Sequence, residues 1–205
     1  MVKKLFLFDF DGVLVDSLDV YEQTVRRCLE RIGTPIIRDR ADYLDLFDHN
    51  FYEAMAAKGV DLAAFMKAAD ETRDVVDYGK MKPFHPIMPV LDRLCRHHVL
   101  LVISSNFTKA IQNVLARIRF DFCFQEILGA DVRFSKKEKI LYAMERYAMD
   151  PDRTYYVGDT AGDVREGRAA GVRTVAVTWG WHSREKLAAA GPEFLVDNPV
   201  ELLDI

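Results

Sequence analysis

Short apolar runs alternate with longer amphipathic segments along most of this chain. The runs are Leu5–Phe8, Val99–Ile103, a weaker one at Phe122–Phe124, Thr154–Val157 and Arg173–Val177. They are nearly apolar throughout rather than alternating between apolar and polar residues, and several are rich in β-branched residues. This pattern is typical of strands that are buried on both faces of a parallel sheet.

Helical patterns lie between these runs. The predicted helices are Pro89–His97, Lys109–Arg117, Lys136–Tyr147 and Asp163–Ala170, the last of which is followed by Gly171 as a helix stop. Strands that alternate with helices predict a doubly wound α/β domain, Rossmann-like, with a parallel sheet of five strands.

Residues 17–82 do not follow this rhythm. We expect Ser17 to cap a helix that runs to Ile32, and two further helices over 41–58 and 61–78. We therefore predict a small helical domain at 17–82, inserted into an α/β domain made of 1–16 and 83–205. The insertion would lie above the carboxyl ends of the strands, where open α/β sheets bind ligands.

Composition and charge narrow the setting. The chain has 205 residues and a net charge of -4, which argues against general nucleic-acid binding. Its three cysteines form no CxxC pair, which favours a reducing compartment over a disulfide framework. No apolar run approaches the roughly 20 residues needed to span a bilayer. We expect a cytoplasmic protein, monomeric or homodimeric, without a nucleic-acid or membrane partner.

The first candidate chemistry follows the first strand, where Asp9 and Asp11 precede Gly12. Two carboxylates at the end of a buried strand are costly unless a cation offsets their charge. Carboxylate oxygens suit Mg²⁺, which also binds substrate phosphate. The pair alone is equally compatible with an acidic turn that is exposed to solvent.

Further polar residues stand where other predicted strands end or where their neighbouring helices begin. Ser104, Ser105 and Asn106 follow the second strand, Lys136 and Lys137 open a helix, and Asp159 and Asp163 come just after the fourth strand. Because the carboxyl ends of parallel strands meet at one edge of the sheet, these side chains are expected to converge.

This combination resembles the haloacid dehalogenase-like superfamily. Asp9-Phe10-Asp11-Gly12-Val13 matches its first motif, Ser104 its second, Lys136 its third, and Gly158-Asp159 with Asp163 its fourth. The insertion after Ser17 matches the helical cap of the family. The segments Val177–His182 and Pro192–Asp197 are similar to its phosphoglycolate-phosphatase-like branch.

The resemblance implies a Mg²⁺-dependent phosphatase that acts on a small phosphorylated metabolite through an aspartyl-phosphate. Asp9 would be the nucleophile. Asp11 would act as general acid and then general base, with its backbone carbonyl on the metal. The implied metal ligands are Asp9, Asp11, Asp159 and Asp163, of which Asp163 acts through a water or orients the lysine.

The implied phosphate-binding residues are Gly12, Ser104, Ser105, Asn106 and Lys136. Spacing to the apolar Ile140-Leu141 pair favours Lys136 over its neighbour Lys137. Asp11 favours phosphate chemistry, because the resembling dehalogenases lack a second acid there. A phosphomutase of the same fold remains an alternative. A non-catalytic phospho-receiver is another, although here the lysine precedes the strand that carries Asp159.

We expect the inserted region to determine substrate specificity, but few of its residues indicate which substrate it binds. His49 or Asn50, in a polar break, could touch substrate, although a surface helix turn is the favoured explanation of both. Arginines 26, 27, 38 and 40 could meet an acidic substrate or merely be solvated. Trp179, Trp181 and His182, after the last predicted strand, could shape the rim of the site or pack in the core.

Overall fold

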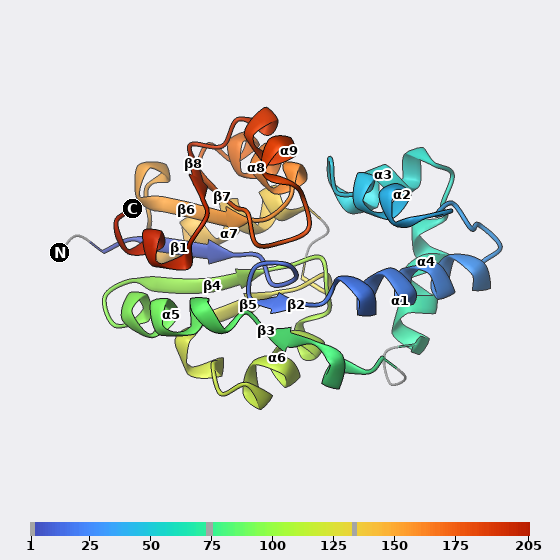
Figure 1. Ribbon diagram of the computed structural model, residues 1–205, viewed down its shortest axis with the longest axis horizontal. Coiled ribbons are helices and arrows are strands. Elements are labelled where there is room, and N and C mark those ends of the chain that lie inside the picture. Colours follow the sequence, from blue (N-terminus) through green and yellow to red (C-terminus); the bar gives the residue numbers. More distant parts are fainter. Residues whose placement is uncertain (1–2, 73–75, 133–134) are drawn as a thin grey trace.

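The computed structural model describes residues 3–72, 76–132 and 135–205, which form an α/β lobe and a helical lobe (Figure 1). The α/β lobe holds a parallel sheet of six strands in the order β5-β4-β1-β6-β7-β8. These strands are β1 Leu5–Phe8, β4 Val99–Ile103, β5 Glu126–Leu128, β6 Thr154–Gly158, β7 Arg173–Val177 and β8 Phe194–Val196. The doubly wound α/β fold is therefore confirmed.

Alternate residues of the central strand enter two different cores. Phe6 and Phe8 of β1 belong to the cluster that includes α5 Met88–Cys95 and α6 Thr108–Arg117. Leu5 and Leu7 belong to the cluster that includes α7 Lys136–Tyr147. Helices α7, α8 Ala161–Ala169 and α9 Arg184–Ala190 lie on the side of the sheet opposite α5 and α6 (Figure 1). Both faces are covered, which explains why the strands are apolar throughout.

The prediction of five strands was one too few, and one strand was misplaced. β8 was missed because its apolar run, Phe194–Val196, is only three residues long. The weak candidate Phe122–Phe124 overlaps a 3-10 turn, η4 Asp121–Cys123, and the edge strand β5 begins later at Glu126. Glu126 interrupts the apolar pattern, so the strand was not recognised in the sequence. Its carboxylate accepts a hydrogen bond from the guanidinium of Arg146 at 3.0 Å.

The helical lobe contains α1 Leu18–Arg31, α2 Arg40–Asp45, α3 Phe51–Ala57 and α4 Leu62–Thr72, packed around a hydrophobic cluster of their own. The single helix predicted over 41–58 is two helices, because the Asn50 side chain caps α3 by accepting from the amides of Tyr52 and Glu53. The predicted helix over 61–78 is α4 up to Thr72, with 73–75 outside the described residues and a 3-10 turn, η2, at Tyr78–Lys80.

Two short strands join the lobes. β2 Val15–Asp16 pairs antiparallel with β3 Lys82–Pro83, so the chain leaves and re-enters the α/β lobe at one place. The remaining short elements are the 3-10 turns η3 His85–Ile87, η5 Pro151–Arg153 and η6 Pro199–Leu203. Both chain ends lie at the far end of the α/β lobe, away from the helical lobe (Figure 1).

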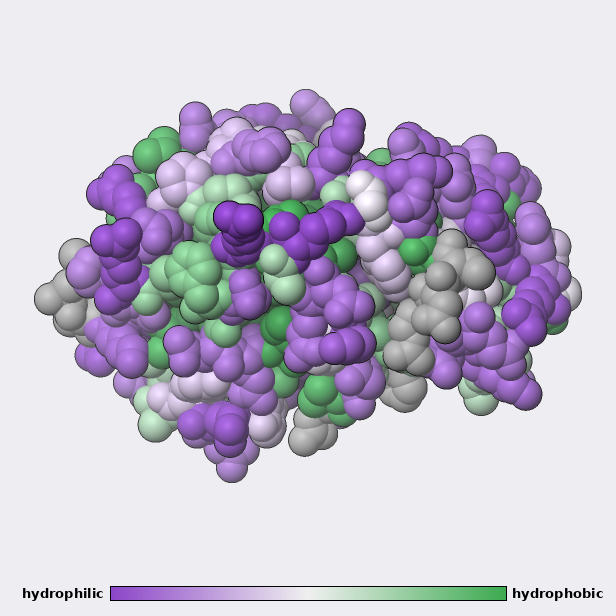
Figure 2. Space-filling model, turned by 90° about the horizontal axis from the view of Figure 1, so that it is seen from below, coloured by the Kyte–Doolittle hydropathy of each residue, from purple (hydrophilic) through white to green (hydrophobic). Residues whose placement is uncertain are grey.

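The outer surface is mainly hydrophilic on the face seen in Figure 2, most evenly over the helical lobe. Many apolar side chains of that lobe are buried in its own hydrophobic cluster. Among the described residues, no helix is long and apolar enough to cross a membrane.

Candidate active site

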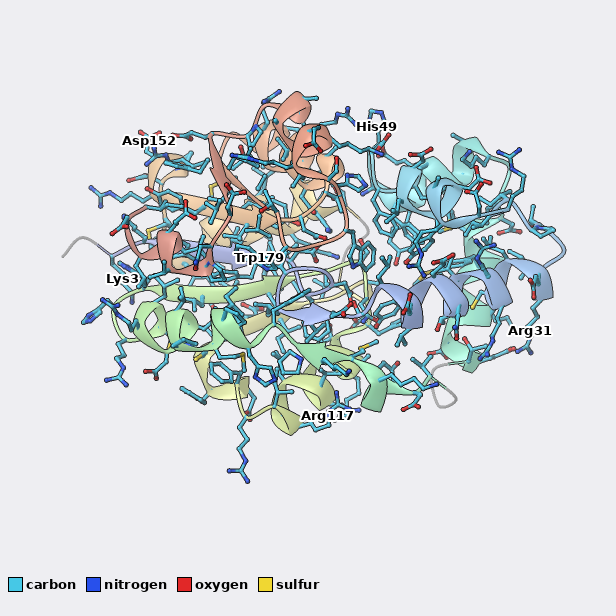
Figure 3. All side chains as sticks on the ribbon, viewed as in Figure 1. Lys3, Arg31, His49, Arg117, Asp152 and Trp179 are labelled. Atoms are coloured by element: carbon cyan, nitrogen blue, oxygen red, sulfur yellow. The ribbon has the colours of Figure 1, made fainter. Side chains whose placement is uncertain are left out.

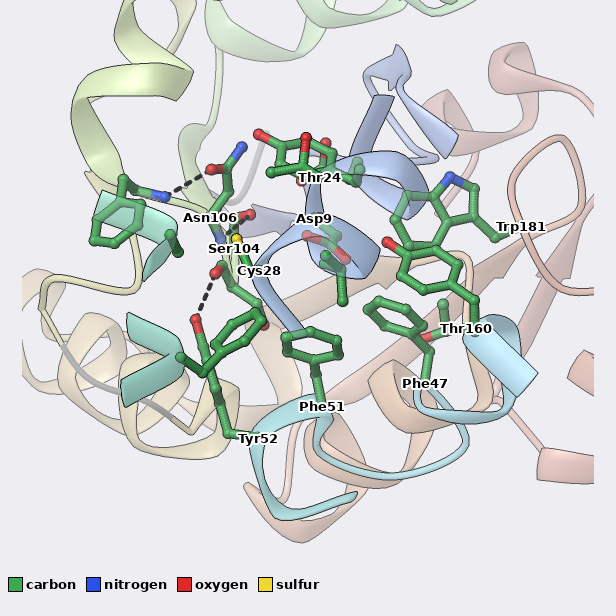
Figure 4. A pocket seen from close by; sticks show the side chains of 18 of the residues that line it. Asp9, Thr24, Cys28, Phe47, Phe51, Tyr52, Ser104, Asn106, Thr160 and Trp181 are labelled. Atoms are coloured by element: carbon green, nitrogen blue, oxygen red, sulfur yellow. Dashed lines mark hydrogen bonds between the residues drawn. The ribbon is translucent and has the colours of Figure 1, made fainter. Parts of the chain in front are cut away.

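A cavity lies between the two lobes, at the carboxyl ends of β1, β4 and β6 (Figure 4). Its α/β side is lined by the residues that follow these strands: Asp9, Asp11, Ser104, Ser105, Asn106 and Asp159, together with Lys136 from α7. The structure thus brings the predicted strand-end residues to one place, as the convergence of parallel strands requires.

Asp9 and Lys136 form the centre of this cluster. The Lys136 ammonium lies 2.6 Å from Oδ2 of Asp9, and Oδ1 of Asp9 accepts from the Phe10 amide at 2.7 Å. Burial raises the pKa of Asp9 to about 6 against the opposing pull of Lys136. Lys137, the alternative lysine, is exposed.

Asp163 holds this lysine in place. Its Oδ1 accepts from Lys136 Nζ at 2.6 Å and from the Tyr156 hydroxyl at 2.7 Å. Its Oδ2 accepts from the hydroxyl of Thr160 at 2.6 Å, in a capping box that opens α8. Burial acts to raise the pKa of Asp163, but Lys136 and the two hydroxyls outweigh it and lower that pKa. The acid therefore stays ionised beside the lysine.

Asp159 forms no ion pair within residues 3–72, 76–132 and 135–205. It is fully buried, its Oδ2 accepts from the Trp181 amide at 2.7 Å, and its Oδ1 has no hydrogen-bond partner. Burial and the nearby charge of Asp163 raise the pKa of Asp159 well above its usual value. Gly12 lies against it with a φ of +77°, and a Cβ there would stand 2.0 Å from Oδ2. Only glycine fits that position.

Carboxylate oxygens of Asp9, Asp159 and Asp163 lie within 4.8 Å of one another. Only one buried ammonium, that of Lys136, faces these three acids in the described part of the chain. Unpaired buried charge is costly, so this oxygen-rich cluster suits an additional cation.

Asp11 stands at the edge of the cavity with its Oδ1 bonded by the Ser17 hydroxyl at 2.6 Å. Ser17 was predicted to cap α1. It occupies the N-cap position, but its side chain makes no capping bond because it donates to Asp11 instead. Burial raises the pKa of Asp11 to about 7. A carboxyl that titrates near neutrality can both give and take a proton.

The loop after β4 presents polar groups opposite Asp9. The Ser104 hydroxyl, which is buried, accepts from the Asn106 amide at 3.0 Å, and the Asn106 side-chain nitrogen has no partner. Beneath this loop, the fully buried Lys139 donates from Nζ to the Ser104 carbonyl at 2.6 Å. Sequence reasoning missed Lys139, because a third lysine in four residues looks like a solvated helix face.

The polar break in the helical lobe does not enter the cavity. His49 is exposed at the outer edge of the molecule (Figure 3), and Asn50 caps α3 and donates to Glu166 of α8 at 3.1 Å. Neither lines the cavity between the lobes. The four arginines, 26, 27, 38 and 40, are also absent from its lining. Three of them are held by acids of the same lobe: Arg26 by Glu22, Arg38 by Asp42, and Arg40 by Asp19 and Glu22.

The three residues after β7 have different roles. Trp179 packs in the α/β core and donates to the Val13 carbonyl at 3.1 Å, whereas Trp181 lines the cavity. His182 links the lobes: its Nδ1 accepts from the Ala161 amide, and its Nε2 lies 3.1 Å from the Leu44 carbonyl in the helical lobe.

Comparison with known proteins places this geometry in a family. A model of haloacid dehalogenase-like hydrolases matches residues 6–177. Phosphoglycolate phosphatase from Synechococcus elongatus is 30% identical over 202 residues, covering 96% of this chain and 94% of that protein. Phosphoglycolate phosphatase from Haemophilus influenzae is 26% identical over 220 residues, covering 98% and 97%.

Solved structures share the fold. A crystal structure of a predicted phosphatase from Clostridium acetobutylicum superposes with a TM-score of 0.84 at 22% identity, covering all of both chains. A haloacid dehalogenase-like family hydrolase from Streptococcus pneumoniae has a TM-score of 0.78 at 20% identity, covering 98% of this chain and 97% of that one.

Proposed function

The chain belongs to the haloacid dehalogenase-like hydrolases, and from that premise we propose that it is a Mg²⁺-dependent phosphatase of small phosphate monoesters. In this proposal residues 17–82 are a cap domain over a catalytic domain made of 1–16 and 83–205. The phosphoglycolate phosphatases that it resembles support phosphate-ester hydrolysis as the reaction class.

Asp9 is the nucleophile in this proposal. One of its carboxylate oxygens attacks phosphorus, the bond to the leaving alcohol breaks, and an aspartyl-phosphate forms that water then hydrolyses. Repulsion between the carboxylate and an anionic phosphate opposes this step, and the Lys136 ammonium at 2.6 Å from Asp9 offsets it. Asp163 positions that ammonium and does not touch substrate.

Asp11 moves the proton. It protonates the leaving alkoxide in the first step and accepts a proton from the attacking water in the second. Its position supports this role, because it lines the cavity two residues from Asp9 while the Ser17 hydroxyl fixes one of its oxygens. Ser104, Ser105 and Asn106 face Asp9 from β4 and are placed to donate to the phosphoryl oxygens.

Asp159 and Asp9 would hold Mg²⁺, with the backbone carbonyl of Asp11. The orphaned Asp159 oxygen and the excess of buried carboxylates fit a hard, oxygen-seeking cation. Asp163 accepts from the Lys136 ammonium and from the hydroxyls of Tyr156 and Thr160, so we assign it to positioning the lysine rather than to direct ligation. When bound, Mg²⁺ supplies positive charge that lowers the repulsion between Asp9 and phosphate.

One observation carries the proposal. A buried lysine bridges Asp9 and Asp163, while Asp159 beside them forms no ion pair with any residue that the structure describes. An acidic turn exposed to solvent would leave these carboxylates on the surface. Their burial does not serve stability either, because uncompensated buried charges are strongly destabilising.

The test is phosphate release from a panel of phosphate monoesters, with p-nitrophenyl phosphate as the reference. We expect release that EDTA stops and Mg²⁺ restores, and that Asp9→Asn abolishes without changing the circular dichroism spectrum. Release that EDTA leaves untouched would contradict the metal role, and wild-type rates in the variant would contradict the nucleophile. A stable phosphoprotein, or an isomerised product without phosphate release, would instead indicate the receiver or the phosphomutase.

A further inference from the structure

The helical side of the cavity has a chemistry of its own. We propose that this site selects phosphate monoesters whose alcohol part is an uncharged aromatic or apolar group with hydrogen-bond acceptors, and that it discriminates against short phosphorylated carboxylates. This inference rests on the proposed phosphatase function and specifies its substrate class.

Aromatic side chains form a continuous wall across the cavity from Asp9 (Figure 4). Phe47 stacks on Phe51 with ring centroids 5.0 Å apart, and it meets Trp181 edge-on at 4.9 Å. Tyr43 contacts both Phe47 and Trp181. Aromatic rings bury much apolar surface and prefer such edge and offset contacts, so the wall offers a ring-binding surface.

This wall carries no positive charge in the part of the chain that the structure describes. Among the described residues that line the cavity, Lys136 is the only lysine or arginine, and its ammonium already donates to Asp9 and Asp163. A substrate such as 2-phosphoglycolate would place its second anion, the carboxylate, against rings that cannot pair with it. Burial of an unpaired carboxylate is strongly unfavourable.

Two hydrogen-bond donors without partners indicate that the alcohol part of the substrate carries hydrogen-bond acceptors. The Tyr21 hydroxyl and the Trp181 indole Nε1 are both buried without a hydrogen-bond partner, and both side chains line the cavity. Buried donors left unsatisfied cost free energy, so a ligand that carries acceptors there is favoured over a purely apolar one.

The experiment compares three esters of primary alcohols: benzyl phosphate, pyridin-3-ylmethyl phosphate and 2-phosphoglycolate. We measure kcat/KM with Mg²⁺ in the wild type, and Kd by calorimetry in Asp9→Asn, which traps the bound ester. We expect both ring esters to exceed 2-phosphoglycolate at least about tenfold in kcat/KM and in affinity, because aromatic burial and carboxylate desolvation act together.

Two variants test the contacts. Tyr21→Phe should lower the kcat/KM ratio of the pyridyl ester to the benzyl ester by roughly twofold to tenfold, the value of one hydrogen bond; Tyr147→Phe, outside the cavity, should leave that ratio unchanged. Met66 of α4 also lines the cavity, so Met66→Lys adds a cation there and should shift the kcat/KM ratio toward 2-phosphoglycolate about tenfold or more. Leu141→Lys, which adds the same charge at an exposed position outside the cavity, should leave that ratio unchanged.

The outcomes separate the two proposals. If 2-phosphoglycolate is turned over best and also binds Asp9→Asn most tightly, the substrate inference is wrong and the phosphatase stands. If no ester is hydrolysed, including p-nitrophenyl phosphate, the phosphatase proposal fails, and the affinities in Asp9→Asn still decide the inference. Where turnover and affinity disagree, affinity decides it.

Discussion

Lys136 and Lys139 lie one helical turn apart on α7, and both are buried, but their surroundings differ. Lys136 faces two carboxylates, which raise its pKa against the effect of burial. Lys139 donates to a backbone carbonyl, and burial together with repulsion from Lys136 lowers its pKa to about 7. Lys136 thus keeps its positive charge, whereas Lys139 supports the Ser104 carbonyl and can lose its proton near neutral pH.

The contrast between Lys136 and Lys137 gives the first prediction. Lys136→Ala should reduce kcat at least a hundredfold, because it leaves the Asp9 carboxylate without its neutralising partner in the step that approaches phosphate. Lys137→Ala, at an exposed neighbour, is the matched control and should stay within about twofold of the wild type. Steady-state kinetics on p-nitrophenyl phosphate measure both, and the reverse order would move the catalytic lysine by one position.

Lys139 gives a prediction on stability. The folded chain loses the Lys139 proton near pH 7, whereas an unfolded lysine keeps it to about pH 10.4. Between these values the unfolded state binds more protons, so this residue makes the free energy of unfolding rise with pH by up to about 1.4 kcal/mol per unit.

Lys139→Met should therefore flatten that rise between pH 7 and pH 9. Urea unfolding at several pH values measures it, with Lys137→Met as the control for loss of an exposed charge. Parallel stability curves for Lys139→Met and wild type would show that the buried ammonium keeps its ordinary pKa.

At the scale of elements, the sequence pattern predicted best the helices that have a long periodic apolar stripe. Helix α7 has the predicted bounds, Lys136–Tyr147, because a Ser135 cap and an apolar stripe both mark it. β8 and β5 escaped because three-residue strands carry too little pattern, and Glu126 interrupted the apolar signal of β5.

The sequence likewise predicted those site residues whose positions follow from strand order, and missed contacts that depend on how distant elements pack. Strand ends located Asp9, Asp11, Ser104 and Asp159, because topology alone brings them together. The bond from Ser17 to Asp11 and the burial of Lys139 under Ser104 depend on how α1 and α7 dock onto the sheet. No local pattern encodes such docking, and the same holds for the aromatic wall, whose rings look like ordinary core residues in the sequence.

Docking of the two lobes at the start of α8 gives an element-scale prediction. The Gly162 amide donates to the Phe47 carbonyl at 2.8 Å, and a Cβ at Gly162 would stand 2.4 Å from the His49 carbonyl. Gly162→Ala should push the loop before α3 away from α8, at a cost of about 1–3 kcal/mol.

We expect faster hydrogen exchange of the amides around Phe47–Asn50 and a fall in kcat/KM of about tenfold in Gly162→Ala. Gly79→Ala is the matched control, because only the flexible Asp77 side chain lies within 3 Å of the added Cβ there. Wild-type exchange and kinetics in Gly162→Ala would show that this contact does not hold the lobes together.

At the scale of the whole molecule, the acidic cluster belongs to the α/β lobe, whereas Tyr43, Phe47 and Phe51 of the aromatic wall belong to the helical lobe and only Trp181 of the named rings comes from the α/β lobe. The paired strands β2 and β3 connect the lobes, and contacts such as Tyr52 to the Ser105 carbonyl, at 2.8 Å, hold them around the cavity. The α/β lobe brings the reacting groups, and the helical lobe brings the surface that meets the rest of the substrate. Reaction type and substrate choice can therefore vary separately in this architecture.

The most direct test of this account is to locate the phosphoryl group on the protein during turnover. The enzyme is quenched in acid while it hydrolyses a phosphate ester labelled at phosphorus, and the tryptic peptide 5–26 is sequenced by mass spectrometry. We expect label on Asp9, and we expect none in Asp9→Asn or in samples without Mg²⁺. Phosphate release without any label on the chain, or label on another residue of that peptide, would contradict it.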